Sequence, residues 1–239
     1  MSCILNIETS TSVCSVALSM DGEVLFAKAS FDGPSHAALL GVFVEEALSV
    51  LKKKGKKALD AVAVSSGPGS YTGLRIGVSV AKGLCFGFGI PLIGIHTLDI
   101  MAATVNSKGD SQIVSMTDNC LYCATLDARR MEVYAAIYDA SLKPVRETKA
   151  DIVEVGTYAS YLEKGKVCFF GNGASKCKSV ITSPNAIFIE DIHPLAVNMI
   201  PLSEQAFAAG KFEDTAYFEP FYLKEFQATV AKNKVLLAR

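Results

Sequence analysis

The sequence predicts an α/β protein built from two related lobes, and three observations support this. The 239-residue chain is 50% hydrophobic, enough to bury one large core or two cores of roughly 100 residues each. A polar break at 106–109 follows a part in which three strands precede alternating helices and strands. Beyond the break, the strand ending at Asp127 and the strand beginning at Glu132 resemble an earlier pair, which ends at Glu8 and begins at Val13.

We therefore expect an N-terminal lobe over 1–105 and a C-terminal lobe over 106–215. A closing segment, 216–239, follows. Its aromatic run Tyr217–Leu223 is too apolar for a free tail, so we expect the segment to dock back on a lobe.

The first lobe opens with three strands, Cys3–Glu8, Val13–Ser19 and Glu23–Ala29, because apolar runs alternate with turn residues. Asp21-Gly22 is a strong hairpin signal between the second and third strands, which makes them antiparallel.

Helices and strands then alternate, which implies parallel crossovers. Apolar residues recur at helical spacing over 36–53, and Ser35 can cap that helix. The Gly67-Pro68-Gly69 turn precedes a second helix, with Ser70 or Thr72 as its cap. The expected elements are helices His36–Lys53, Thr72–Phe88 and Thr97–Val105, with strands Ala61–Ser65 and Pro91–Ile95 between them.

The second half reads as a less regular copy of the first. Its expected strands are Gln112–Thr117, Ala124–Asp127, Glu132–Tyr138, Val167–Phe170 and Ala186–Ile189, with a helix over Ile152–Leu162 and one or two helices within His193–Phe212, broken near Pro201.

Composition excludes several classes of protein. The net charge is −1 and no lobe is basic as a whole, so the chain is not an evident nucleic-acid binder. Seven irregularly spaced cysteines and no signal peptide predict free thiols in the cytoplasm, and the Cys120-x-x-Cys123 pair lacks a second pair for zinc. Lys82 and Pro91 interrupt the apolar run 78–95, so we expect no membrane span.

Five lysines lie within 52–57, after the first helix. They favour either an RNA or phosphate patch or, more simply, a favourable charge at a helix C-terminus followed by a solvated loop.

A phosphate site is the first chemical hypothesis, because this strand and helix pattern describes the actin-like architecture. The turn before the second helix could hold an anion through Thr9, Ser10, Gly67, Gly69 and Ser70. The matching second hairpin, Ala128-Arg129-Arg130, lacks the glycine that close approach to phosphate usually requires. An ATP-dependent transferase or kinase is therefore the alternative hypothesis and not the main one.

Metal or hydrolase chemistry has little support. A ligand pair one helical turn apart is absent, because Leu40 stands four residues after His36. The other histidines, His96 and His193, have no ligand-like neighbours, and no nucleophile-elbow pattern occurs. We expect no catalytic residue, no metal and no cofactor, and a metallopeptidase is a third, weaker hypothesis.

Small residues mark the second helix at four-residue spacing, namely Gly73, Gly77 and Ala81, then Gly83 and Gly87. Each helix-interior glycine costs roughly 0.5–1 kcal/mol against alanine, so a compensating contact is expected. That contact is either close packing on the lobe's own sheet or an interface with another subunit. The interface hypothesis predicts that Gly77→Leu abolishes pairing and leaves the monomer folded.

Several motifs resemble the TsaB (YeaZ) family, which belongs to a glycoprotease-like group. They are Ile4–Thr11, Ser66–Gly77, Pro91–Gly94, Asp127–Tyr134 and the closing Pro220-Phe221-Tyr222-Leu223-Lys224. The resemblance spans nearly the whole chain, and the missing HxxxH pair separates it from the catalytic paralogue, TsaD.

The resemblance implies an actin-like (ASKHA, ribonuclease H-like) duplicated two-lobe fold. It also implies a non-catalytic scaffold in the addition of threonylcarbamoyl to the adenosine next to the tRNA anticodon. Such a protein pairs with a TsaD-type transferase, supports a TsaE-type ATPase and forms a homodimer when alone, and we expect its contact with tRNA to be indirect. The implied partner-binding residues lie on the first two helices: His36, Leu39, Leu40, Phe43, Tyr71, Gly73, Leu74, Arg75, Gly77, Val78, Ala81 and Lys82.

One departure from the family concerns the end of the first strand, where the family often has Asp and this chain has Glu8. The extra methylene would displace a metal-bound water, which weakens the ATP hypothesis and leaves the scaffold hypothesis unchanged.

Overall fold

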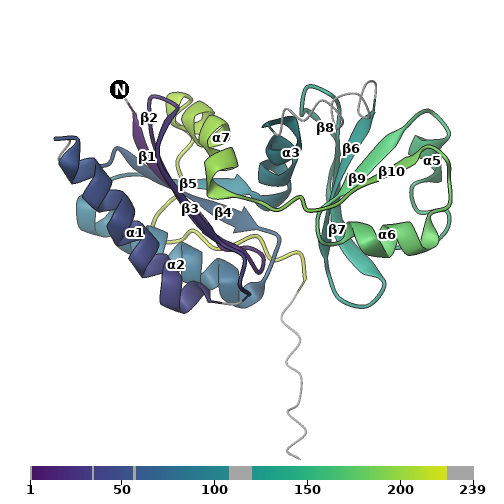
Figure 1. The fold of residues 1–239 in the computed structure, drawn as a ribbon, viewed down its shortest axis with the longest axis horizontal. Helices are drawn as coiled ribbons and strands as arrows, with labels where there is room; N and C mark the ends of the chain where they lie inside the picture. Colours follow the sequence, from purple (N-terminus) through teal and green to yellow (C-terminus); the bar gives the residue numbers. More distant parts are fainter. Residues whose placement is uncertain (1, 34, 56–57, 108–119, 225–239) are drawn as a thin grey trace, which may run out of the picture.

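The structure, a computed structural model, describes residues 2–33, 35–55, 58–107 and 120–224. It contains two lobes side by side, each with a five-stranded mixed sheet (Figure 1). The first sheet has the order β3-β2-β1-β4-β5, in which β1 pairs antiparallel with β2 and parallel with β4. Its strands are β1 Cys3–Glu8, β2 Cys14–Met20, β3 Glu23–Ser30, β4 Ala61–Gly67 and β5 Leu92–His96.

The second sheet repeats this topology. Its order is β8-β7-β6-β9-β10, with an antiparallel β6–β7–β8 meander and parallel β6–β9 and β9–β10 pairs. Its strands are β6 Leu121–Asp127, β7 Glu132–Tyr138, β8 Pro144–Ile152, β9 Val167–Phe170 and β10 Ala186–Ile189. The identical strand order confirms the duplicated, actin-like two-lobe fold.

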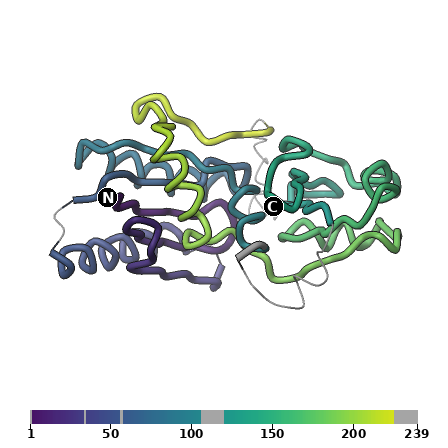
Figure 2. The backbone as a smooth tube through the Cα atoms, turned by 90° about the horizontal axis from the view of Figure 1, so that it is seen from above, coloured from purple at the N-terminus to yellow at the C-terminus, as the bar shows by residue number. Residues whose placement is uncertain are grey.

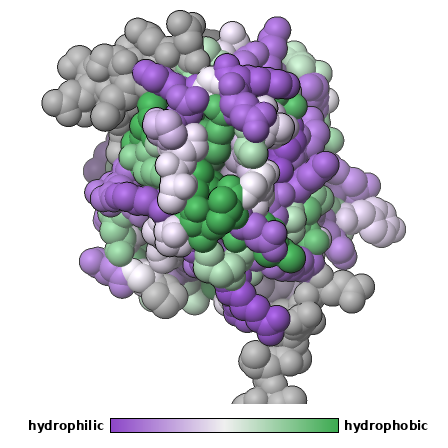
Figure 3. Space-filling view, turned by 90° about the vertical axis from the view of Figure 1, so that its right-hand side faces the viewer, coloured by the Kyte–Doolittle hydropathy of each residue, from purple (hydrophilic) through white to green (hydrophobic). Residues whose placement is uncertain are grey.

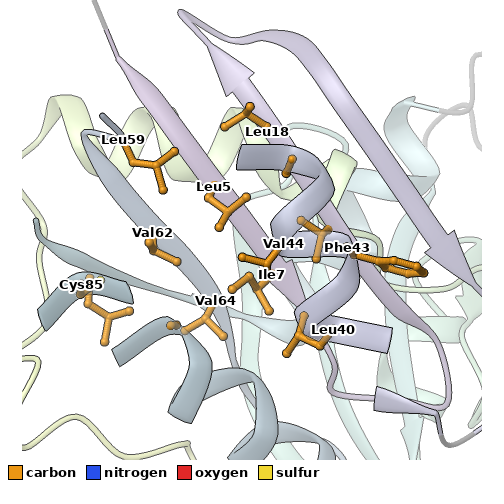
Figure 4. Close-up of a cluster of buried hydrophobic side chains, with 14 of the residues drawn as sticks. Leu5, Ile7, Leu18, Leu40, Phe43, Val44, Leu59, Val62, Val64 and Cys85 are labelled. Atoms are coloured by element: carbon orange, nitrogen blue, oxygen red, sulfur yellow. The ribbon is translucent and has the colours of Figure 1, made fainter. Parts of the chain in front are cut away.

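Helices cover both faces of the first sheet. Helices α1 (His36–Lys53) and α2 (Tyr71–Phe88) pack on one face, over Leu5, Ile7 and Val64 (Figure 4). Helices α3 (Thr97–Ser107) and α7 (Ala196–Ala208) cover the other face.

Helix α3 also joins the lobes, because Leu98, Met101 and Ala102 share a core with strands β6 and β7 of the second sheet. Short helices α5 (Ala159–Leu162) and α6 (Ala174–Val180) cover the far face of that sheet. No helix in the described ranges is long and apolar enough to cross a membrane.

The expected lobe boundaries need one correction, which concerns α7. This helix falls within 106–215, yet it packs on β1, β2 and β5 of the first lobe, where Met199 joins the core. Figure 2 shows the chain returning from the second lobe to cross the first sheet. The first lobe is therefore discontinuous in sequence.

The chain then follows the first lobe through 213–224, which we call the C-terminal strap. The Glu213 amide donates to the Leu92 carbonyl at 2.9 Å, and the Phe221 amide donates to the Ser66 carbonyl at 2.6 Å. Lys82 Nζ donates to the carbonyls of Ala216 (2.9 Å) and Phe218 (3.2 Å). The rest of the expected closing segment, 225–239, lies outside the described residues.

Several expectations for the second half were wrong. Strand β8 was not predicted, and the helix expected over Ile152–Leu162 reduces to the single turn of α5, because Ile152 ends β8. Helix α6 was also missed, and α7 continues through Pro201 without a break. The strand expected at Gln112–Thr117 lies outside the described residues.

Candidate functional site

Helix α2 follows directly from β4 through the glycine-rich turn. Ser70 caps it, since the Ser70 hydroxyl accepts from the Gly73 amide at 3.2 Å, and Gly89 ends it at φ 66°. The β1–β2 loop lies against its first two turns, where Thr9 Oγ donates to the Gly73 carbonyl at 2.8 Å. Cβ atoms built at Gly73 and Gly77 would collide with Thr9. Close packing within the lobe therefore explains these two glycines.

Most of the residues expected to bind a partner point inward. Leu40, Phe43, Gly73, Leu74, Gly77, Val78 and Ala81 are buried in the first lobe. His36 is buried too, and its Nε2–H donates to the Thr11 carbonyl at 2.8 Å. Leu39, Tyr71 and Lys82 are half-buried, with Lys82 committed to the C-terminal strap, and only Arg75 is exposed. Apart from Arg75 and Lys82, these residues therefore pack the two helices on their own lobe.

The outward side of α1 and α2 forms a different surface, which we call the docking face. The two helices lie side by side on the first sheet (Figure 1) and pack against each other. The docking face consists of ten exposed or half-buried residues of the two helices, all uncharged except Glu45: Ala38, Gly41, Val42, Glu45, Thr72, Ile76, Ser79, Val80, Gly83 and Gly87.

Three glycines of the docking face have no contact within the chain that explains them. A Cβ built at Gly41, Gly83 or Gly87 meets no atom within 4 Å. Each lies inside a helix, where glycine costs roughly 0.5–1 kcal/mol relative to alanine. Neither a positive φ nor a close contact with the described residues requires glycine at these three positions.

The glycine-rich turn is not an open anion cradle, which corrects the expected anion site. The Ser70 amide donates to the Ser10 carbonyl at 2.6 Å, and the Ser10 amide donates to Glu8 Oε1 at 2.7 Å. A Cβ at Gly69 would collide with the Ser10 carbonyl, and one at Gly67 would lie 2.8 Å from the Phe221 carbonyl oxygen. The turn is filled by the chain's own backbone.

A buried acid lies beside this turn and further disfavours an anion. Glu8 is fully buried, and burial raises its pKa to about 7 against the hydrogen bonds from Ser10 and Ser65 that lower it. Its Oε2 has no hydrogen-bond partner. Over the described parts of the chain, no three His, Cys, Asp or Glu side chains gather as a metal site would need.

The corresponding region of the second lobe is also occupied from within. Lys176 Nζ lies 2.6 Å from Asp127 Oδ1, and the Asn172 side chain accepts from the Asp127 amide at 2.9 Å. Cβ atoms at Gly171 or Gly173 would press on Thr125. The glycine-free β6–β7 hairpin still reaches the left-handed region, at Arg129 (φ 67°) and Arg130 (φ 48°), a conformation that sequence reasoning did not predict.

A cavity of about 300 Å³ opens between the lobes beside α3, bounded by His96, Asp99, Tyr138 and Phe221. The Tyr138 hydroxyl already donates to Asp99 at 2.6 Å, and burial raises the pKa of Tyr138. His96 packs edge-on against Phe221 at 5.6 Å. These side chains are paired with one another, so they do not converge on a bound group.

The chain is similar to known proteins over most of its length. The family model described as TsaD, tRNA N6-adenosine threonylcarbamoyltransferase, matches residues 32–232. The tRNA threonylcarbamoyladenosine biosynthesis protein TsaB of Escherichia coli K12 is 31% identical over 245 residues, which cover 92% of this chain and 94% of that protein. The Bacillus subtilis TsaB is 30% identical over 135 residues, covering 56% of this chain and 54% of that protein.

A solved structure agrees with these relatives. YeaZ from Pseudomonas aeruginosa superposes with a TM-score of 0.76 at 27% identity, covering 93% of this chain and all of that one.

Proposed function

Because the chain belongs to the TsaB (YeaZ) family, we propose that it is a non-catalytic scaffold subunit in the addition of threonylcarbamoyl to the adenosine next to the tRNA anticodon. It pairs with a TsaD-type transferase through the docking face, supports a TsaE-type ATPase and works in the cytoplasm. The same face forms a homodimer when the partner is absent. The open glycines of α1 and α2 carry this proposal.

The physical argument rests on Gly41 and Gly83. A helix that carries no side chain at these points lets a partner backbone approach closely. Val42, 47% exposed, supplies apolar area beside them, and burying such surface yields roughly 25 cal/mol per Å². A second copy of this helical pair fits this description because it carries the same open glycines.

The reactive groups of the first lobe favour a scaffold over an enzyme. Glu8 is fully buried, and the turn beside it is occupied by backbone contacts from its own chain, which leaves no open phosphate site next to the carboxyl group. Calorimetry with ATP and magnesium tests the alternative of an ATP-dependent transferase or kinase, since micromolar binding by the isolated chain would favour that enzyme.

The docking face is tested by adding bulk at its open glycines. Gly83→Leu should leave the fold intact and reduce the solution mass from dimer to monomer by light scattering, because a leucine holds the partner backbone away. Co-purification with a TsaD-type protein should fall in parallel. Gly165→Leu is the matched control, since Gly165 in the second lobe also has no atom within 4 Å. A dimer that survives Gly83→Leu and Gly41→Leu would refute this docking face.

A further inference from the structure

Three flat side chains stack beside the docking face, on the side of α2 that faces the C-terminal strap. The Arg75 guanidinium lies 4.6 Å from the centre of the Tyr71 ring. The Tyr71 ring in turn lies 5.0 Å from the ring of Tyr222, tilted by 38°. Arg75 is exposed and both tyrosines are half-buried, so the row is open to solvent along one side.

Positive charge continues from this row across to the second lobe. The strap carries Lys224 two residues beyond Tyr222, and Lys224 Nζ pairs with Glu132 at the start of β7. The Glu132 amide donates to the Arg129 carbonyl at 3.2 Å, so the β6–β7 hairpin lies beside Lys224. Burial raises the pKa of Tyr134, whereas the positive charges of Lys224 and Arg129 lower it. Both cations therefore lie close to the Tyr134 side chain.

Two acids in this region are held in ion pairs, whereas three arginines are not. Glu132 pairs with Lys224, and Asp127 pairs with Lys176. Within the described residues, Arg75, Arg129 and Arg130 take part in no ion pair. Helix α2 has no acidic residue over its whole length. Three exposed arginines outside any ion pair make this a local positive surface on a chain of net charge −1, which suits an anionic ligand.

We propose that these six residues, Tyr71, Arg75, Tyr222, Lys224, Arg129 and Arg130, form a stacking patch that binds a single-stranded RNA loop. Unpaired bases stack on aromatic rings and on arginine planes, and their phosphates contact the flanking cations. A base-paired stem offers no free base faces. The patch therefore fits RNA loops better than duplexes.

This proposal departs from the expectation that contact with RNA is indirect, and it moves the contact away from the lysines after α1. Lys52, Lys53 and Lys54 are exposed, but they lie at the C-terminal end of α1, whereas Arg75 lies near the N-terminal end of α2. The stacking patch itself does not depend on the proposed function. Only the identity of the RNA as a tRNA anticodon loop rests on the proposed function.

The test is fluorescence anisotropy of the full chain with a labelled RNA hairpin carrying a single-stranded loop, against a duplex of the same stem. The wild type should prefer the hairpin. Tyr222→Leu should weaken hairpin binding by roughly 5- to 150-fold, as expected for one lost stacked base. Arg129→Gln with Arg130→Gln should weaken it and lower the salt dependence by about 0.7 per lost phosphate contact.

Lys53→Gln with Lys54→Gln is the matched control, because it removes the same charge at the competing site. It should leave hairpin binding unchanged. The proposal is overturned if the wild type binds no RNA at low salt, binds hairpin and duplex alike, or loses as much affinity in the lysine control as in the arginine pair. It is also overturned if the patch variants keep RNA binding and lose only protein pairing.

A different result would refute the proposed function. A Gly83→Leu chain that still pairs would refute the docking face even if the RNA loop binds, because RNA binding is measured on the isolated chain.

Discussion

Replacing glycine by alanine in α2 should stabilise the chain where the glycine faces open space and destabilise it where the glycine packs against Thr9. Gly83→Ala places a methyl group in open space, so it should raise the free energy of unfolding by roughly 0.5–1 kcal/mol, the ordinary preference of a helix for alanine. Gly77→Ala gains the same preference but places its Cβ in collision with Thr9 Oγ.

The cost at Gly77 follows from what Thr9 does. Thr9 is fully buried and donates to the Gly73 carbonyl at 2.8 Å, so moving it leaves a buried donor unpaired, which costs about 1–3 kcal/mol. Overpacking of the core adds about 1–3 kcal/mol. After the helix preference is subtracted, Gly77→Ala should destabilise the chain by about 1–5 kcal/mol. The packing argument therefore predicts, against the interface hypothesis, that Gly77→Leu destabilises the monomer itself.

Thermal unfolding followed by circular dichroism measures both effects, at concentrations low enough to keep the chain monomeric. For a chain of this size each kcal/mol shifts Tm by about 2–4 °C, so the two variants should move in opposite directions by measurable amounts. In a Thr9→Ala background the penalty of Gly77→Ala should shrink, because the colliding oxygen is gone. Equal shifts for Gly77→Ala and Gly83→Ala, or strict additivity with Thr9→Ala, would refute the packing argument.

Other expectations concern Glu8, the strap and the thiols. Since burial raises the pKa of Glu8 from 4.5 to about 7, the folded state binds more protons, so stability falls as pH rises from about 4.5 to 7 and stays lower above it. Glu8→Gln should abolish up to about 3 kcal/mol of this dependence in urea titrations at pH 5 and 8. Lys82→Met should speed proteolysis of the strap and hydrogen exchange at the Phe221 amide, leaving Tm nearly unchanged. All seven cysteines are buried, so a thiol reagent should modify them only after denaturation, and rapid native labelling would contradict this.

The elements of the first lobe were predictable because each carries a pattern of its own. The strand Cys3–Glu8 and the helix His36–Lys53 match the structure residue for residue. Strand β8 has no such pattern, since it is a polar edge strand whose exposed residues outnumber its half-buried ones. Its conformation is fixed by pairing with β7, a long-range contact that periodicity does not reveal.

The candidate site was predictable only in part, for a related reason. The sequence identified the small residues of α2 but not which of them face the sheet. Gly77 and Gly83 are six residues apart, which at 100° per residue turns them about 120° away from each other around the helix. The choice between them depends on where Thr9 lies, and Thr9 arrives from a loop more than sixty residues earlier.

The glycine-rich turn shows why the helix it begins is available for binding. A helix N-terminus carries unpaired N–H groups and a partial positive charge, and in phosphate-binding proteins a ligand satisfies both. Here the Ser10 carbonyl accepts from Ser70, the Ser70 hydroxyl accepts from Gly73, and the strap covers Gly67. The turn before α2 is thus occupied by its own chain, and the hydrogen bond from the Phe221 amide to the Ser66 carbonyl holds Tyr222 beside Tyr71. A turn that binds its own chain fixes the outer surface of α2 in place, and that surface carries both the docking face and part of the stacking patch.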